Sequence, residues 1–311
     1  MSLDWEIVRE TAKDMVSGRM SNEEKEKLRE RYVKSIEKID PDISNFTGLE
    51  IEKSLDSILI LDPYDWIDIT IENYKQIFES NKIKVSLSWS DRKILSQLIG
   101  QQVAYMSTKV LGQYDPYFFG KGKIGQMYFL HPNIEKTAME LRVGIDDFID
   151  WIAIHERTHQ YEFDNKKSSW LKDYINKKIQ EAIKMDINNR RFSFFSRFDD
   201  PNLIARSDLQ ATMCLMEGFS DYVMNKLAPK FIFSHSQIKE KFEKKRSEKG
   251  DILQLKRQQY IIGEKFVNEV VDSKGMKFLI KAFEVPENLP SYCEINEPRL
   301  WIERMKKNFW Y

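Results

Sequence analysis

Apolar residues recur at intervals of three and four positions along most of the chain, which is the period of an amphipathic helix. This spacing predicts helices over residues 66–78 and 90–112, and mainly helical structure from residue 133 onward. The same period runs through the first forty residues, at Trp5, Val8, Met15, Leu28, Tyr32 and Ile36. A turn is expected at Asp40–Pro41, because proline removes a helical hydrogen bond and disrupts the preceding turn.

The stretch from residue 114 to 134 breaks this helical period. It contains Pro116 and three glycines, and then the apolar run Gly125–Leu130, which predicts a β-strand. One hypothesis is that this strand lies at the edge of a sheet, where an extended substrate could pair with it. Residues 120–125, GKGKIG, match the pattern GxGxxG, but they precede the strand, whereas a dinucleotide-binding loop follows one.

These patterns together predict a mostly helical α+β fold with a small β-sheet. The 311 residues are enough for a large buried core. We expect residues 1–95 to form a helical N-terminal region and residues 96–311 to form the core that carries the site. The alternative is one continuous domain.

The composition narrows the class of protein further. Lys and Arg together number 49, as do Asp and Glu, so a net charge of zero gives no general reason to expect a nucleic-acid partner. The longest apolar runs are too short to span a bilayer, and the first residues lack the apolar segment of a secretion signal. The two cysteines, Cys214 and Cys293, form no CxxC pair, which favours a reducing compartment. We therefore expect a cytoplasmic protein without a membrane partner.

The segment WIAIHERTHQYEF, residues 151–163, contains a candidate metal site. Its centre, HERTH, fits the pattern His-Glu-x-x-His. Residues four apart share one face of a helix, so His155 and His159 can bind one ion. Zinc takes such imidazole ligands, and Glu156 is placed to serve as general base for a zinc-activated water. The alternative is an accidental match on a helix, which predicts no bound metal.

A catalytic zinc site also needs a third protein ligand. The metzincin pattern is excluded, because no later histidine occupies its third-ligand position. In CLMEGFSDYVMN, Glu217 and Asp221 lie four residues apart on a predicted helix with an apolar composition. We predict that Glu217 is the third ligand and that Asp221 orients a ligating imidazole through its other nitrogen, as in thermolysin-like gluzincins. The alternative is that both acids pair with Arg or Lys at the helix surface.

A di-iron site is a further reading of Glu156 and His159, since Glu-x-x-His is half of a ferritin-like centre. Such a centre needs a second Glu-x-x-His on another helix. The remaining histidines, His131 and His235, have no glutamate three residues before them, so the di-iron interpretation fails.

Several separated segments resemble the zincin-like hydrolases, or zinc-dependent metalloproteases, of archaea and actinobacteria. These segments are VLGQYDP, MYFLHPNI, WIAIHERTHQYEF, LMEGFSDYVM, KRQQYIIGEKFVNEVVDSKGM and PENLPSYCEI. The resemblance covers about residues 96–311 and implies a zincin fold and a zinc ion. Some members of that family carry a label that links them to deazaflavin coenzyme biosynthesis, but the resemblance implies no particular substrate. Arg157 and Phe219 depart from the family's usual residues and leave the predicted ligands untouched.

The residues and the resemblance together favour a zinc metallopeptidase that acts on a peptide or another amide. Such chemistry needs a hydrogen-bond donor for the oxyanion. Tyr260 is the preferred donor, with a hydrogen-bonded core tyrosine as the alternative interpretation. Weaker candidates are Tyr161, Tyr222 and His235. The competing class of protein is a zinc-binding scaffold with a zincin fold and no turnover, and the sequence leaves the oligomeric state open.

Overall fold

The computed structural model describes residues 3–51, 58–80, 88–116, 125–188, 208–247 and 252–308. The chain divides into two compact units. The first comprises Met1–Val33 and Leu55–Glu140, and the second comprises Lys34–Ser54 and Leu141–Tyr311. This division differs from the expected boundary near residue 95. The reason is that β-strands from both sides of that position pair in a single sheet.

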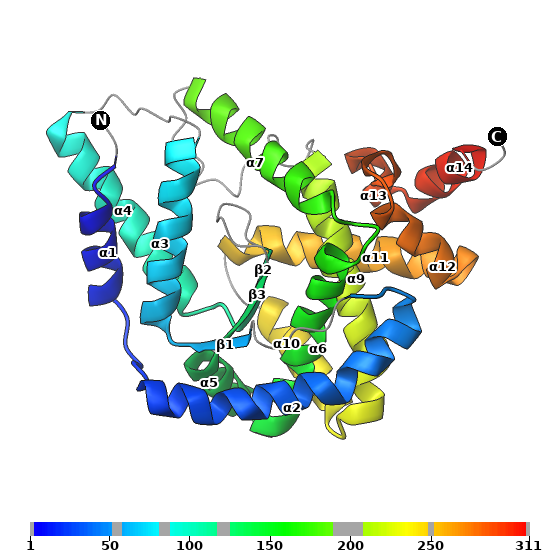
Figure 1. Cartoon of the computed structure of the whole chain (residues 1–311), viewed down its shortest axis with the longest axis horizontal. Helices are drawn as coiled ribbons and strands as arrows, with labels where there is room; N and C mark the ends of the chain where they lie inside the picture. The colour runs from blue at the N-terminus through cyan, green and yellow to red at the C-terminus, as the bar shows by residue number, and fades with distance from the viewer. Residues whose placement is uncertain are drawn as a thin grey trace. The chain divides into compact units, whose positions relative to one another are not determined.

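The first unit combines helices with a small sheet (Figure 1). Its elements are α1 (Trp5–Asp14), the start of α2 (Asn22–Thr47), β1 (Ile58–Leu61), α3 (Pro63–Ser80), α4 (Trp89–Ser107), β2 (Gly112–Asp115), β3 (Gln126–Leu130) and α5 (His131–Leu141). The predicted helix over 66–78 is confirmed as part of α3. The helix predicted over 90–112 ends earlier, at Ser107, and β2 follows it.

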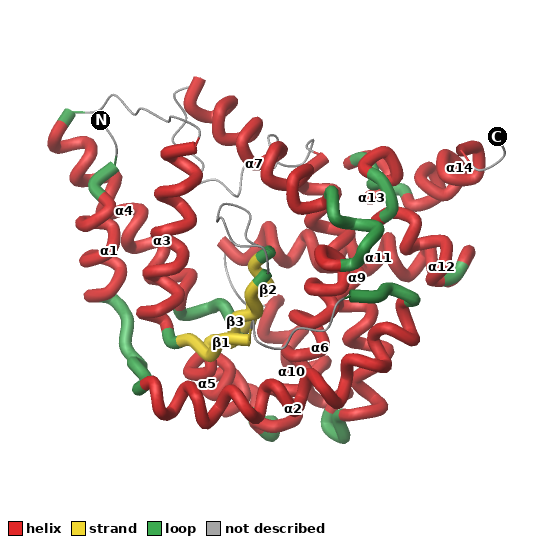
Figure 2. Tube along the Cα trace, in the orientation of Figure 1, coloured by secondary structure: helices red, strands yellow, loops and turns green. Residues whose placement is uncertain are grey.

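The described sheet has the strand order β1-β3-β2 (yellow in Figure 2). Strand β3 pairs in parallel with β1 and antiparallel with β2. The strand predicted at Gly125–Leu130 is therefore confirmed, but its placement at a sheet edge is wrong. Both neighbouring strands have only four residues, too few for a period of two to be visible in the sequence.

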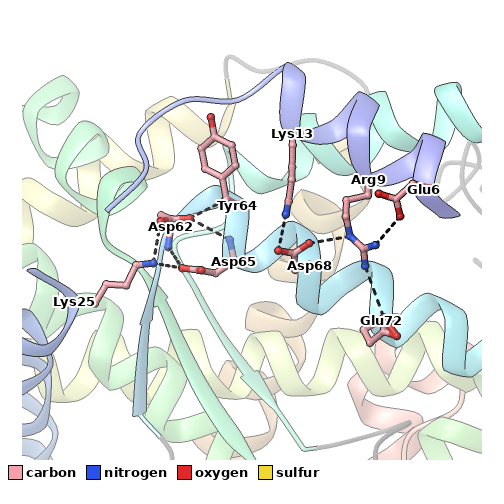
Figure 3. Close-up of polar contacts among 9 residues, drawn as sticks. All are labelled: Glu6, Arg9, Lys13, Lys25, Asp62, Tyr64, Asp65, Asp68 and Glu72. Carbon is pink, nitrogen blue, oxygen red and sulfur yellow. Dashed lines mark hydrogen bonds and ion pairs between the residues drawn. The ribbon is translucent and has the colours of Figure 1, made fainter. Parts of the chain in front are cut away.

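Buried Asp62 organises the start of α3 (Figure 3). Its carboxylate accepts hydrogen bonds from the backbone N–H groups of Tyr64 and Met20, both at 2.9 Å. The ammonium group of Lys25 lies 3.0 Å from the same carboxylate. Asp62 thus caps α3 and also holds the chain that enters α2. These bonds lower the pKa of Asp62, although burial alone would raise it.

The second unit is helical throughout its described part. Its elements are the end of α2, α6 (Ile145–Asp164), α7 (Leu171–Asn188), α9 (Asp208–Phe231), α10 (His235–Ser247), α11 (Ile252–Lys274), α12 (Met276–Leu279), the 3-10 turns η1 (Ile280–Phe283) and η2 (Pro286–Asn288), α13 (Tyr292–Asn296) and α14 (Pro298–Asn308). Helix α9 packs against both α6 and α11 (Figure 1). The mostly helical α+β fold is confirmed.

The turn expected at Asp40–Pro41 is wrong, because α2 continues through Pro41 to Thr47. The structure accounts for this continuation through the burial of Asp40. Its carboxylate accepts a hydrogen bond from Arg157 at 2.8 Å and one from the Tyr161 hydroxyl at 2.9 Å. These tertiary bonds offset the backbone hydrogen bond that proline removes.

Among the helices that the structure describes, none combines the length and the apolar composition that a membrane span requires.

Candidate metal centre

Helix α6 carries the HERTH motif in the interior of the second unit. The helix begins after Gly144, with Asp146 and Asp147 in its first turn, where the helix dipole favours negative charge. Almost every side chain from Phe148 to Phe163 is buried. The motif therefore does not lie on a solvated helix surface, where an accidental match would be expected.

Helix α9 supplies Glu217 and Asp221, which are both buried. Beside Glu217, Gly218 lies against Gly263 of α11. A Cβ atom at Gly218 would lie 2.1 Å from the carbonyl carbon of Gly263, so only glycine allows the two backbones to pass this closely. The glycine contact thus fixes the distance between α9 and α11 next to the candidate site.

Three atoms of ligand type converge between α6 and α9. His155 Nε2 lies 3.2 Å from His159 Nε2, and Glu217 Oε2 lies 3.5 Å from the first nitrogen and 3.8 Å from the second. Ligand atoms around a tetrahedral zinc stand about 3.3–3.4 Å apart, as bond lengths of about 2.0–2.1 Å require. The observed separations bracket this value. The geometry of His155, His159 and Glu217 therefore fits one zinc ion.

The outer nitrogen of each imidazole lies beside a carboxylate. His155 Nδ1 is 3.1 Å from Asp221 Oδ1. His159 Nδ1 is 2.6 Å from Glu162 Oε2, and the Ser220 hydroxyl oxygen is 3.1 Å from the same nitrogen. An ionised carboxylate can only accept a hydrogen bond, so each ring is favoured to carry a proton on Nδ1.

This protonation pattern tests whether the residues suit a metal. With the ring protons on Nδ1, both Nε2 atoms present lone pairs to each other and to the Glu217 carboxylate. Three electron-rich atoms at 3.2–3.8 Å in a largely buried cluster repel one another unless a proton or a metal ion lies among them. The cluster therefore fits a bound metal better than a purely structural network.

The pKa values of the two histidines reflect the same demand for positive charge. Burial lowers the pKa of His155, but the Asp221 and Glu217 carboxylates outweigh burial and raise this pKa to about 9. Burial is also outweighed at His159, where Glu162 and Glu217 raise the pKa well above 6.5. In the metal-free protein, protons therefore supply the positive charge that a metal ion would bring.

The two residues with predicted catalytic roles lie in the same unit as these ligands. Glu156 directly follows His155 on α6 and is buried. Tyr260 lies on α11, and its ring centre is 6.2 Å from that of His155. The tyrosine is half-buried. Helix α11 thus brings a phenol to the edge of the histidine cluster.

The weaker candidates for an oxyanion donor have other contacts. The Tyr161 hydroxyl donates to Asp40. The ring of Tyr222 stacks on Phe46, with 6.2 Å between ring centres. His235 lies at the start of α10, where its Nδ1 is 3.1 Å from a backbone carbonyl. Of the four candidates, Tyr260 is thus the one with a ring contact to a predicted ligand.

Glu162 is a site residue that the sequence patterns did not single out. It lies three residues after His159, a spacing that places two side chains on the same face of a helix. This spacing could have indicated the contact. The sequence could not indicate that Glu162 is fully buried, because burial depends on the helices packed around α6.

Comparison with known proteins agrees with this geometry. The chain belongs to the zincin-like metallopeptidase family, whose sequence model matches residues 3–302. This match confirms the family resemblance and extends it over the N-terminal third. The archaeal and actinobacterial setting and the link to deazaflavin coenzymes stay predictions. No significant match was found among curated proteins.

The fold is also similar to a solved structure. A crystal structure from Chloroflexus aurantiacus, provisionally described as a hydrolase with a novel fold, superposes with a TM-score of 0.76 at 28% sequence identity. The match covers 98% of this chain and 99% of the other. Family and structural neighbour together support a zinc hydrolase at the level of the family.

Proposed function

We propose that this protein is a zinc-dependent peptidase in which His155, His159 and Glu217 hold the metal. The observation that carries the proposal is the convergence of two imidazole nitrogens and one carboxylate oxygen at 3.2–3.8 Å. Both imidazoles have their outer nitrogens beside carboxylates, so the inner nitrogens are left for an ion. Family membership supports the choice of zinc and of a hydrolytic reaction.

When bound, zinc would act as a Lewis acid that polarises a carbonyl group and lowers the pKa of water. Glu156 would accept the proton of the attacking water and then pass it to the leaving amine. Tyr260 would donate a hydrogen bond to the oxygen that gains charge as the amide carbon becomes tetrahedral. Asp221 would hold the ring of His155 so that its Nε2 faces the metal.

A peptide is the proposed substrate because this type of site most often cleaves peptide bonds. Another amide is the alternative within the same chemistry. The second candidate function is a zinc-binding scaffold that does not turn over. It is favoured by the burial of His155, Glu217 and Asp221, beside which His159 is half-buried. The two functions share the metal site and differ in the consequence of changing Glu156.

The test combines metal analysis with digestion of an unbiased peptide library. The wild type is compared with Glu156→Gln, which removes the general base and leaves the three ligands in place. We expect one zinc per chain in both proteins and cleavage by the wild type alone. If the wild type binds one zinc per chain but cleaves no peptide that Glu156→Gln leaves intact, the scaffold function is favoured. Absence of zinc from both proteins would refute the metal site itself.

A further inference from the structure

Glu162 lies against the second histidine of the motif and has no assigned role. Its Oε2 is 2.6 Å from His159 Nδ1, a shorter distance than the 3.1 Å between His155 and Asp221. We infer that Glu162 is a positioning residue that holds the ring of His159 with Nε2 toward the metal. This inference rests on the proposed zinc site. It adds a second positioning carboxylate, so that Asp221 orients the ring of His155 and Glu162 orients the ring of His159.

The burial of Glu162 supports this role. The side chain is fully buried. Among the residues that the structure describes, the other oxygen of Glu162, Oε1, has no hydrogen-bond partner. The carboxylate makes its polar contact through Oε2, with His159 Nδ1. A buried carboxylate with so few partners is unfavourable in a purely structural role. It becomes favourable when it faces an imidazole that donates to it and binds a cation through its other nitrogen.

Ser220 is a second possible acceptor for the same ring proton. Its hydroxyl oxygen is 3.1 Å from His159 Nδ1, half an ångström farther than the carboxylate. Hydrogen bonds to an ionised acceptor are shorter and about twice as strong as neutral ones. Glu162 should therefore dominate the orientation of the ring, with a smaller contribution from Ser220.

The two carboxylates that contact the Nδ1 atoms of the histidines come from different helices. Asp221 reaches His155 from α9, so it aligns the ring only when α6 and α9 are packed together. Glu162 is three residues from His159 on α6 itself. The orientation of His159 is thus set within one helix, whereas that of His155 depends on the contact between two helices.

The test measures zinc affinity by competition with a chelator of known affinity. The full-length variants are Glu162→Gln, Ser220→Ala and the control Asp164→Asn. Asp164 has the same charge on the same helix, is exposed, and accepts a hydrogen bond from Gln160. We expect Glu162→Gln to weaken zinc binding by about 10–100-fold, the usual effect of losing an outer partner. Ser220→Ala should weaken it by about threefold or less, and Asp164→Asn should leave it unchanged.

A second measurement does not depend on the folding of any variant. In wild-type protein labelled with ¹⁵N-histidine and loaded with zinc, the His159 ring should be protonated at Nδ1 and bound through Nε2. Binding through Nδ1, or unchanged zinc affinity in Glu162→Gln, would overturn the positioning role while leaving the zinc site intact. If the wild type binds no zinc, the proposed function fails first and the inference fails with it.

Discussion

The contact between Gly263 of α11 and the backbone of α9 allows a quantitative prediction. A Cβ atom at Gly263 would lie 1.9 Å from the carbonyl oxygen of Cys214, and real Cβ atoms almost never come closer than 3.0 Å to such an atom. In Gly263→Ala, the two helices must therefore separate by at least about 1.1 Å. Overpacking of this kind costs about 1–3 kcal/mol. The higher helix propensity of alanine offsets up to about 1 kcal/mol.

We therefore expect Gly263→Ala to lower the free energy of unfolding by about 1–2 kcal/mol in urea denaturation followed by circular dichroism. The control is Gly144→Ala, because a Cβ atom at Gly144 meets nothing within 4 Å. Its effect should stay below about 1 kcal/mol, the usual cost of alanine at a helix N-cap.

The same variant separates the metal ligands from the proposed oxyanion donor. His155, His159 and Glu217 lie on α6 and α9, whereas Tyr260 lies on α11. Displacement of α11 should leave the zinc affinity of Gly263→Ala within about threefold of wild type and should reduce kcat by at least tenfold, since about 1 Å of misplacement is costly in catalysis. A variant as stable as Gly144→Ala would refute the packing argument. Loss of zinc together with kcat would refute the division of roles between the helices.

Three further predictions follow from the site and the fold. Glu217→Ala removes a proposed ligand and should weaken zinc binding by more than about 100-fold in chelator competition. The reason is that even the loss of a residue that only orients a ligand weakens binding by about 10–100-fold. Zinc affinity equal to that of the wild type would exclude Glu217 as a ligand. Zinc uptake by the metal-free protein should release protons, because the pKa of His155 is raised to about 9 and the ligating imidazole must be neutral. Calorimetry in buffers of different ionisation enthalpy should detect this release, and the apparent affinity should rise with pH as His155 and His159 lose the protons that compete with the metal. Asp62→Asn should lower the free energy of unfolding by about 1–3 kcal/mol near neutral pH. The reason is that the neutral amide attracts the Lys25 ammonium group and the Met20 backbone N–H less strongly than the buried carboxylate does. The pKa of Asp62 is lowered on folding, so this contribution is present above its unfolded pKa and declines as pH falls through the folded value. A difference between variant and wild type that did not shrink in acid would contradict the role of the ionised carboxylate.

Features that depend on local chain geometry were readable in the sequence. HERTH predicts two imidazoles on one face because a helix repeats every 3.6 residues, whatever surrounds it. The same period made Glu217 and Asp221 neighbours on one face. The apolar residues around each motif predicted that both helices would be buried, and both are.

Features that depend on which segments meet were decided only by the tertiary structure. The packing of α6 against α9 brings Glu217 within 3.5 Å of His155, and no local pattern indicates the distance between two helices. Helix α2 passes through Pro41 because Arg157 and Tyr161 bind Asp40, so bonds from distant residues override a local signal. Strand β3 is central because two four-residue strands pair with it.

Glu162 lies on the border between these two kinds of information. Its spacing from His159 is local, and its burial is tertiary. A glutamate three residues after a histidine on an exposed helix contributes little, because water screens the pair. Packing removes that water, and the same spacing then becomes a short contact that can orient a metal ligand. The sequence therefore determined which chemical groups share a helix face, and the packing of helices determined which of them act together.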